Sequence, residues 1–96
     1  MAGYILATLD VTDPAKFDLY REKVLPLITQ FQGETVINTE AIAVREGRPT
    51  RRRVIAVRFP TPQLAHDFLD CDAYGPLFRL RCEAADGEVI IVEGRG

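Results

Sequence analysis

The sequence predicts an α+β fold of the ferredoxin-like, βαββαβ type. Two kinds of segment follow one another in the order strand, helix, strand, strand, helix, strand. In the strand segments apolar residues alternate or run together, and in the helical segments they recur every three or four positions. Pro and Gly signals separate the segments. That order predicts a four-stranded antiparallel sheet, and the right-handed crossover rule places the helices on one face of it.

The composition is that of one globular domain, which we assign to residues 1–96. Hydrophobic residues make up 47% of the chain and charged residues 27%, which excludes a disordered chain. The formal net charge of −2 disfavours a general nucleic-acid binder. No apolar run is long enough to span a membrane, and no secretory signal is visible. We therefore expect a cytoplasmic protein that binds neither nucleic acid nor membrane.

The first predicted strand, residues 3–11, is apolar on both of its faces. A helix follows, with Asp13 as its N-cap and Pro14 in its first turn. Pro26 lies inside the apolar stripe of this helix and predicts a kink, because proline removes one helical hydrogen bond. Gly33 is expected to stop the helix.

The middle of the chain predicts a β-hairpin. Residues 34–45 are rich in β-formers, and their polar centre at 38–40 predicts a bulge or a bend. The Gly and Pro within residues 46–50 predict a turn there. The next strand is expected over residues 51–59. Two strands joined by a short Gly/Pro loop pair with each other.

The second helical region begins with Thr61 as N-cap and Pro62 in the first turn. Cys71 and Asp72 interrupt it, and Asp72 is expected to cap the helical segment that follows.

Asp86 and Gly87 predict a tight turn before the last strand, residues 88–93. This strand is apolar on both faces, as the first strand is. The two helices cover only one face of the sheet, so the other apolar face needs a different cover. Large exposed apolar patches are rare on monomers. The pattern therefore predicts a homodimer in which the two sheets pack face to face.

Five polar residues fall on otherwise apolar faces and are the candidate site residues. Tyr20 and Tyr74 are the candidate catalytic residues, since their hydroxyls can donate hydrogen bonds or move a proton. Arg21, Arg53 and Arg81 are the candidate ligand-binding residues, because a guanidinium holds a carboxylate or an enolate. The alternatives are that the tyrosines belong to the core and that the guanidinium groups of the arginines are exposed to solvent.

Other chemistry has weak support in the sequence. His66, Cys71 and Cys82 lack the tight pairs of a structural zinc site, so no metal is expected and the thiols are expected to be free. No cofactor is implied. Haem would need an axial ligand from His66, which falls on the helix face that is expected to be exposed to solvent. The arginines at 48–53 could suggest nucleic acid, but no aromatic residues lie among them for base stacking.

Short pieces along nearly the whole chain resemble those of a known bacterial family. The pieces are at residues 3–7, 10–13, 20–21, 24, 26, 33, 46–47, 53–55, 59–60, 65, 68, 74, 80–81 and 92–94. In this order they resemble the domain of unknown function 1330 family, within the dimeric α/β-barrel superfamily. The chain departs from the family where Gln32 replaces a glycine, at residues 71–74, and in having no tryptophan.

The resemblance implies a ferredoxin-like protomer and a homodimer, and it supplies no reaction. Relatives in the superfamily include cofactor-free monooxygenases, haem-degrading enzymes, lactone isomerases and dehydratases, so whether this protein is an enzyme stays open. Two hypotheses follow. The first is a dimeric protein that binds a small, anionic organic molecule between helices and sheet, with monooxygenase-like or isomerase-like chemistry that needs no cofactor. The second is a non-enzymatic accessory or regulatory module, in which the same polar residues pair internally and Arg81 is bridged to a carboxylate such as Asp10 or Glu93.

Overall fold

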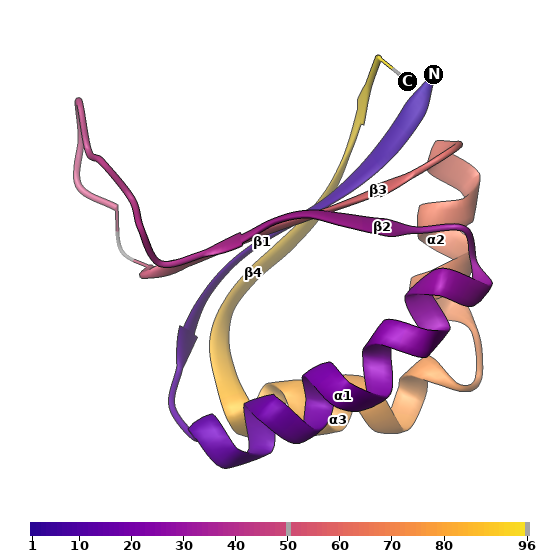
Figure 1. Ribbon diagram of the computed structural model, residues 1–96, viewed down its shortest axis with the longest axis horizontal. Helices are drawn as coiled ribbons and strands as arrows, with labels where there is room; N and C mark the ends of the chain where they lie inside the picture. The colour runs from indigo at the N-terminus through magenta and orange to yellow at the C-terminus, as the bar shows by residue number, and fades with distance from the viewer. Residues whose placement is uncertain (50, 96) are drawn as a thin grey trace.

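A computed structural model describes residues 1–49 and 51–95 of the protein and confirms the predicted fold class (Figure 1). Its elements are β1 (Ala2–Val11), α1 (Pro14–Gln30), β2 (Glu34–Thr39), β3 (Arg53–Phe59), α2 (Pro62–Asp70), α3 (Tyr74–Ala84) and β4 (Ala85–Gly94). The predicted turn at 46–50 and the chain end at 96 include positions that lie outside the described residues.

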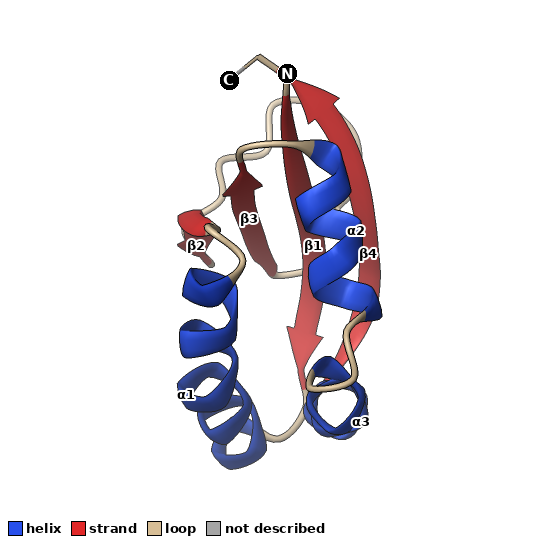
Figure 2. Ribbon diagram, turned by 90° about the vertical axis from the view of Figure 1, so that its right-hand side faces the viewer, coloured by secondary structure: helices blue, strands red, loops and turns tan. Residues whose placement is uncertain are grey.

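The four strands form one antiparallel sheet in the order β2-β3-β1-β4. Ile5 in the central strand β1 pairs with Val57 of β3 and with Ile91 of β4. All three helices lie on one face of this sheet (Figures 1 and 2). The arrangement therefore leaves the other face, here called the open face, without cover from within the chain.

Both predicted helix starts are confirmed. Asp13 accepts a hydrogen bond from the backbone N–H of Lys16 at 3.1 Å, and Thr61 accepts one from the N–H of Leu64 at 3.2 Å. A proline follows each cap, where its missing N–H costs nothing. Helix α1 continues through Pro26 for one more turn.

The prediction that Gly33 stops α1 is wrong. Gln32 adopts the left-handed conformation, with φ of 66°, and Gly33 donates its backbone N–H to the carbonyl of Ile28 at 2.8 Å. The glycine has a packing role instead. A Cβ atom at position 33 would lie 2.7 Å from both the Cγ2 of Ile28 and the Cε1 of Phe59. Gly33 therefore lets α1 and β3 approach each other closely.

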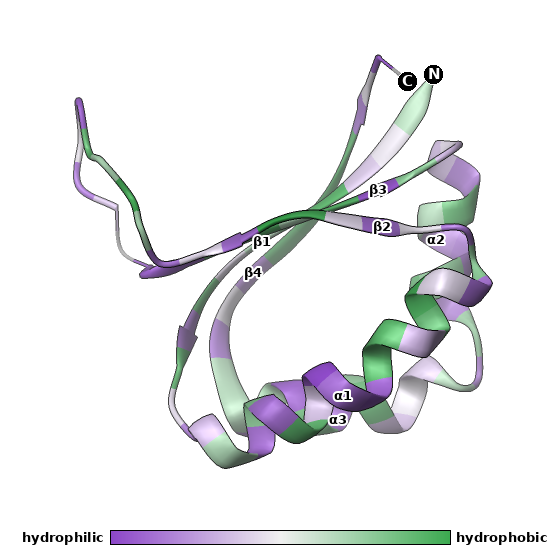
Figure 3. Ribbon diagram, viewed as in Figure 1, coloured by the Kyte–Doolittle hydropathy of each residue, from purple (hydrophilic) through white to green (hydrophobic). Residues whose placement is uncertain are grey.

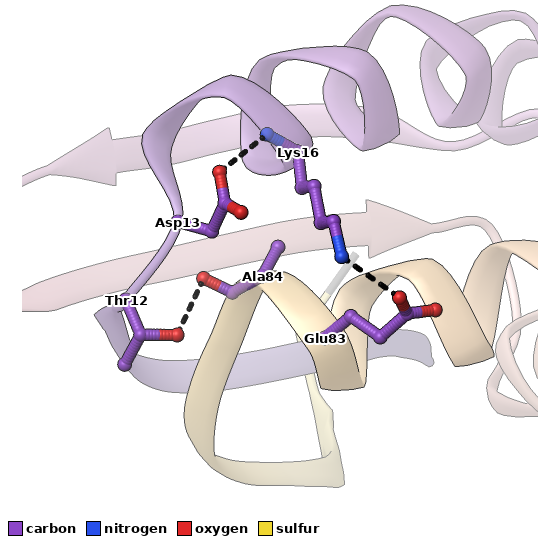
Figure 4. Close-up of polar contacts among 5 residues, drawn as sticks. All are labelled: Thr12, Asp13, Lys16, Glu83 and Ala84. Carbon is purple, nitrogen blue, oxygen red and sulfur yellow. Dashed lines mark hydrogen bonds and ion pairs between the residues drawn. The ribbon is translucent and has the colours of Figure 1, made fainter.

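The start of α1 is tied to the end of α3 (Figure 4). The backbone N–H groups of Thr12 and Asp13 donate to the carbonyl of Ala84 at 2.8 and 3.0 Å. The ammonium group of Lys16 contacts the carboxylate of Glu83 at 2.9 Å, and this hydrogen bond raises the pKa of Lys16. These contacts hold the two helices side by side beneath the sheet.

The predicted hairpin forms, but its strands are shorter than predicted. β2 ends at Thr39 rather than at residue 45, its bulge lies between Thr35 and Ile37 rather than at 38–40, and β3 begins at Arg53 rather than at residue 51. Alternation alone predicted a strand over 41–45, where the sheet offers no partner. Residues 40–49, 51 and 52 instead form a projecting segment, here called the arm (Figure 1).

Two predictions about the second half of the chain are wrong. Asp72 does not cap α3, whose N-cap position is taken by Ala73 without a side-chain hydrogen bond. The predicted interruption between α2 and α3 is nevertheless present. Asp86 and Gly87 form no turn, because β4 begins at Ala85, directly after α3. Gly87 is needed inside the strand, since a Cβ atom there would overlap the backbone carbonyl of Thr8 in β1.

The core between helices and sheet is centred on aromatic rings. Phe68 of α2 lies 5.5 Å from Phe59 of β3 and 5.0 Å from Tyr74 of α3, measured between ring centroids. All three side chains are buried. Tyr74 is thus held by packing on one side of its ring, which fixes where its hydroxyl can lie.

The open face carries an apolar strip across all four strands of the sheet. By the register, Leu6 of β1 lies between Ala56 of β3 and Ile90 of β4, and Ile37 of β2 extends the strip. Ile90 is 54% exposed and Ile37 45%. In Figure 3 hydrophobic residues occupy the middle of the strands and recur on the arm. The second apolar face of the sheet, which the sequence predicted, is therefore present as the open face.

Candidate functional site

Two tyrosine hydroxyls meet between α1 and α3. The Oη atoms of Tyr20 and Tyr74 are 3.1 Å apart, within hydrogen-bond distance. Tyr20 lies on the apolar stripe of α1, and Tyr74 is the first residue of α3. The contacts that tie α1 to α3 bring these residues together from 54 positions apart. One hydroxyl hydrogen serves the pair, so the other remains available to a ligand.

Arg81 lies two helical turns after Tyr74, on the same side of α3. Its side chain is only 9% exposed. Its Cζ atom lies 5.7 Å from the ring centroid of Phe78, and its Nη2 approaches the Sγ atom of Cys82 at 3.6 Å. Among the described residues, Nε and Nη1 find no hydrogen-bond partner. A positive charge is thus buried at Arg81, and no carboxylate of residues 1–49 or 51–95 forms an ion pair with it.

A small cavity of about 70 Å³ lies between the helices and the sheet. Both tyrosines and Arg81 line it, and exposed Arg21 lies at its rim. The other lining residues are Ile5, Ala7, Leu9, Phe17, Val24, Leu25, Ile28, Thr35, Asn38, Ile55, Val57, Phe68, Leu69 and Val89. The walls are therefore apolar except near the tyrosine pair, Arg81 and two polar residues of β2.

A larger groove of about 710 Å³ adjoins this cavity. Cavity and groove share four residues: Leu69, Tyr74, Arg81 and Val89. The outer part of the groove is lined by Asp70, Cys71, Asp72, Gly75 and Phe78. Arg81 thus lies where the enclosed space meets the open one. Sequence analysis identified Arg81 and Tyr74 but missed Leu69, Phe78 and Val89, which looked like ordinary apolar residues.

Burial raises the pKa of Tyr20, and the neighbouring Tyr74 raises it further. Arg81 acts in the opposite direction, because its positive charge favours the tyrosinate, but burial dominates. Tyr20 is therefore protonated at neutral pH. In the cavity it serves as a hydrogen-bond donor or acceptor and not as a base.

Arg53 does not line the cavity, although its side chain faces the helices as predicted. Its Nη1 donates to Oδ1 of Asn38 at 2.7 Å, and its Nη2 lies 3.4 Å from Oε1 of Glu40. Its Cζ atom is 5.6 Å from the ring centroid of Phe17. Partners from β2 and the arm thus occupy two nitrogens of this guanidinium.

The internal pairing of polar residues that the second hypothesis predicts is present for the tyrosine pair and for Arg53, but the predicted pairing of Arg81 with a carboxylate is wrong for the described residues. Asp10 does not reach Arg81. It accepts hydrogen bonds from Nη1 of Arg51 at 3.3 Å and from the backbone N–H of Arg52 at 3.0 Å, which anchors the base of the arm. Within residues 1–49 and 51–95, neither Asp10 nor Glu93 forms an ion pair with Arg81.

The residues considered for metal or haem are scattered. His66 is exposed on α2, Cys71 is half-buried at the end of α2, and Cys82 is exposed on α3. In the part of the chain that the structure describes, no three His, Cys, Asp or Glu side chains come together as metal ligands. The described helices are also too short or too polar to cross a membrane.

The fold is shared with solved structures at low sequence identity. RPA0582, a protein of unknown function from Rhodopseudomonas palustris, is 13% identical, with a TM-score of 0.79 over 99% of this chain and 83% of its own. SnoaB, a cofactor-independent oxygenase from Streptomyces nogalater, is 14% identical, with a TM-score of 0.71 over 99% of this chain and 94% of its own. HapK from Hahella chejuensis is 13% identical, with a TM-score of 0.61 over 98% and 93%. These likenesses confirm the ferredoxin-like fold.

Among curated proteins, none matches this sequence. A family model does match, over residues 2–95, and its description is Domain of unknown function (DUF1330). That match spans nearly the whole chain and agrees with the resemblance seen in the sequence. The chain therefore belongs to the DUF1330 family.

Proposed function

We propose that this protein binds a small anionic organic molecule between its helices and its sheet, with Arg81 as the residue that holds the anion. One observation carries the proposal. Arg81 is only 9% exposed and lines the cavity, and two nitrogens of its guanidinium have no partner among the described residues. Burying an unpaired charge is costly, so folds supply a partner. An anionic ligand supplies it here.

The neighbouring groups suit a planar oxyanion. A guanidinium can donate two parallel hydrogen bonds to a carboxylate, which sets both position and orientation. The Tyr20 and Tyr74 hydroxyls, 3.1 Å apart, add a donor beside it. Because Tyr20 stays protonated, this donor persists across the physiological pH range. Arg21 at the rim adds a second positive charge on the entry side.

A second candidate function is cofactor-independent chemistry on the bound anion. Arg81 and the tyrosine pair can stabilise negative charge on an oxygen atom, as an enolate requires. The likeness to SnoaB, a cofactor-independent oxygenase, favours this candidate. The described residues that line the cavity supply no base, since none of them carries a carboxylate or an imidazole. Such a substrate enters as an anion or loses its proton to Asp70 or Asp72 of the groove.

In this proposal the protein is a homodimer in which the open faces of the two sheets pack together. The strip of Leu6, Ile37 and Ile90 needs a cover that the described chain does not provide. The arm rises on the same side of the sheet, away from the helices (Figures 1 and 2). Ile42 and Val44 on the arm are exposed, so the arm extends the apolar surface around a second copy. A two-fold pair suits one self-complementary patch.

We also assign the protein to the cytoplasm. Its two cysteines, Cys71 and Cys82, are both free, and Cys82 is exposed. An exposed free thiol is typical of a reducing compartment.

A native mass spectrum of freshly purified protein, repeated after denaturation, tests the proposal. The expected result is two chains plus an added small molecule that is released on denaturation and absent from the Arg81→Met variant. If the Arg81→Met protein retains the same molecule, Arg81 is not the anion site. An Ile90→Asp variant should give single chains, because a charge at the centre of the packed faces loses its water. A monomeric wild-type protein would overturn the dimer.

The non-enzymatic accessory module remains the alternative. It predicts two bare chains and no change in the oxygen content of any molecule supplied to the protein. Retention of a ligand without turnover supports the binding function and excludes the catalytic candidate for that ligand.

A further inference from the structure

The structure points to a class of ligand, and this inference rests on the proposed anion site. We propose that the ligand is a monocarboxylic acid with an apolar body larger than the cavity. Its carboxylate binds Arg81, and its body lies outside the cavity, in the groove against Phe78 and Val89.

The size of the cavity carries the first step. An engineered protein cavity of about 150 Å³ accommodates benzene. The cavity beside Tyr20 and Tyr74 measures about 70 Å³, so it holds a carboxylate or a methyl group but not a ring. The adjoining groove of about 710 Å³ falls in the range of organic-ligand sites. Because Arg81 lines both spaces, an anion bound there has room for its body only on the groove side.

The walls of the groove carry the second step. Phe78 is 50% exposed and Val89 36% exposed, although both flank a buried arginine. Leu69 continues the apolar wall from α2. Three apolar side chains from α2, α3 and β4 thus converge on one open space. An apolar body covering them would remove their surface from water.

The rim of the groove carries the third step. Asp70 and Asp72, both exposed, line its outer part. A ligand whose body lies in the groove brings its far end towards these carboxylates. A second negative charge at that end would be repelled by them. The rim therefore favours one carboxylate over two.

Calorimetric titration with a graded set of acids tests the inference. The probes are acetate, benzoate, 2-naphthoate and naphthalene-2,6-dicarboxylate, each added to ligand-free protein. We expect affinity to rise by about tenfold or more from acetate to 2-naphthoate, because more apolar surface is buried. The dicarboxylate should bind more weakly than 2-naphthoate.

Variants separate the groove from the anion site. Phe78→Ala and Val89→Ser should each abolish most of the gain in affinity from acetate to 2-naphthoate. Val89→Ser is needed because Phe78 also contacts Arg81, and Val89→Ser leaves that contact in place. Leu19→Ala, at an exposed leucine of α1 outside cavity and groove, is the matched control.

The outcomes distinguish this inference from the proposed function. If the gain with size survives both groove variants but disappears in Arg81→Met, the body does not lie in the groove and the anion site stands. If the dicarboxylate binds as tightly as 2-naphthoate, the preference for one carboxylate is wrong. If no acid binds the wild-type protein, the anion site itself is wrong. The inference is supported if the gain in affinity from acetate to 2-naphthoate is seen in wild type and in Leu19→Ala but is lost in the groove variants and in Arg81→Met.

Discussion

Arg53 and Arg81 look alike in the sequence and differ in the structure. Each faces the helix-covered side of the sheet, and each guanidinium lies close to a phenylalanine ring, at 5.6 Å from Phe17 and 5.7 Å from Phe78. Arg53 donates to Asn38 and faces the carboxylate of Glu40. Among the described residues, the guanidinium of Arg81 has only one hydrogen-bond contact, a weak one with the thiol of Cys82.

The difference separates an arginine that has partners within the chain from the arginine that we propose binds an anion. A buried guanidinium whose partners lie within the chain stabilises the fold that holds it. A buried guanidinium without partners destabilises the ligand-free protein, and that cost is recovered only when an anion binds. Arg53 therefore links β3 to β2 and to the arm, whereas Arg81 lines the cavity and the groove.

The largest expected effect is on ligand affinity. Arg81→Met should weaken binding of benzoate by about 100-fold or more, since it removes a charge-assisted pair of hydrogen bonds. Arg53→Met should change it by less than about twofold, because Arg53 lies outside the cavity lining. Calorimetric titration of both variants measures this directly. Equal losses in the two variants would erase the distinction between them.

The same two variants should move stability in opposite directions. Arg53→Met should lower the free energy of unfolding by about 1–3 kcal/mol, because it leaves the Asn38 amide without its donor. Arg81→Met should raise it by about 1 kcal/mol in ligand-free protein, since a buried unpaired charge is replaced by an apolar chain of similar length. Urea unfolding at one fixed protein concentration measures both. A clear loss of stability in Arg81→Met would mean that Arg81 has a partner within the protein.

Stability at alkaline pH should report how buried the Tyr20 hydroxyl is. Its pKa in the folded protein is raised above the ordinary value of 10.0 by burial. Above pH 10 the unfolded chain therefore releases a proton that the folded chain keeps. The contribution of Tyr20 to the free energy of unfolding is thus complete below pH 10 and is lost as the pH rises above it. Relative to Tyr20→Phe, wild type should lose about 1.4 kcal/mol per pH unit above that point.

Urea unfolding of the two proteins at pH 9, 10 and 11 measures this difference, and the other titrating groups cancel because they are common to both. Parallel curves would mean that the Tyr20 hydroxyl ionises freely in the folded protein and faces water.

The smallest expected effect concerns the carboxylate partner of Arg53. The Glu40 side chain is 54% exposed, whereas that of Arg53 is 23% exposed, so the pair is partly screened by solvent. Glu40→Gln should lower the free energy of unfolding by about 0.2–1 kcal/mol, and the loss should shrink in high salt. Unfolding in low and high salt tests this. A loss as large as that of Arg53→Met would make Glu40, rather than Asn38, the main partner.

Most of the fold could be predicted because it depends on local patterns. The caps at Asp13 and Thr61 and the periodicity of the helices act within a few residues, and chain order does the rest. The failures lie where a distant neighbour decides. Residues 41–45 have strand-like composition but no strand to pair with, and Gly87 is required by the carbonyl of Thr8 rather than by a turn.

The candidate site shows the same division more sharply. Residue type and helical spacing were sufficient to select Tyr20, Tyr74 and Arg81, since polar groups on apolar faces are visible in the chain itself. Whether a guanidinium is paired depends on side chains far away in sequence, and the same reasoning selected Arg53, which Asn38 and Glu40 occupy. Local chemistry thus marks which residues can bind an anion, whereas the packing of distant segments determines which of them is left free to do so.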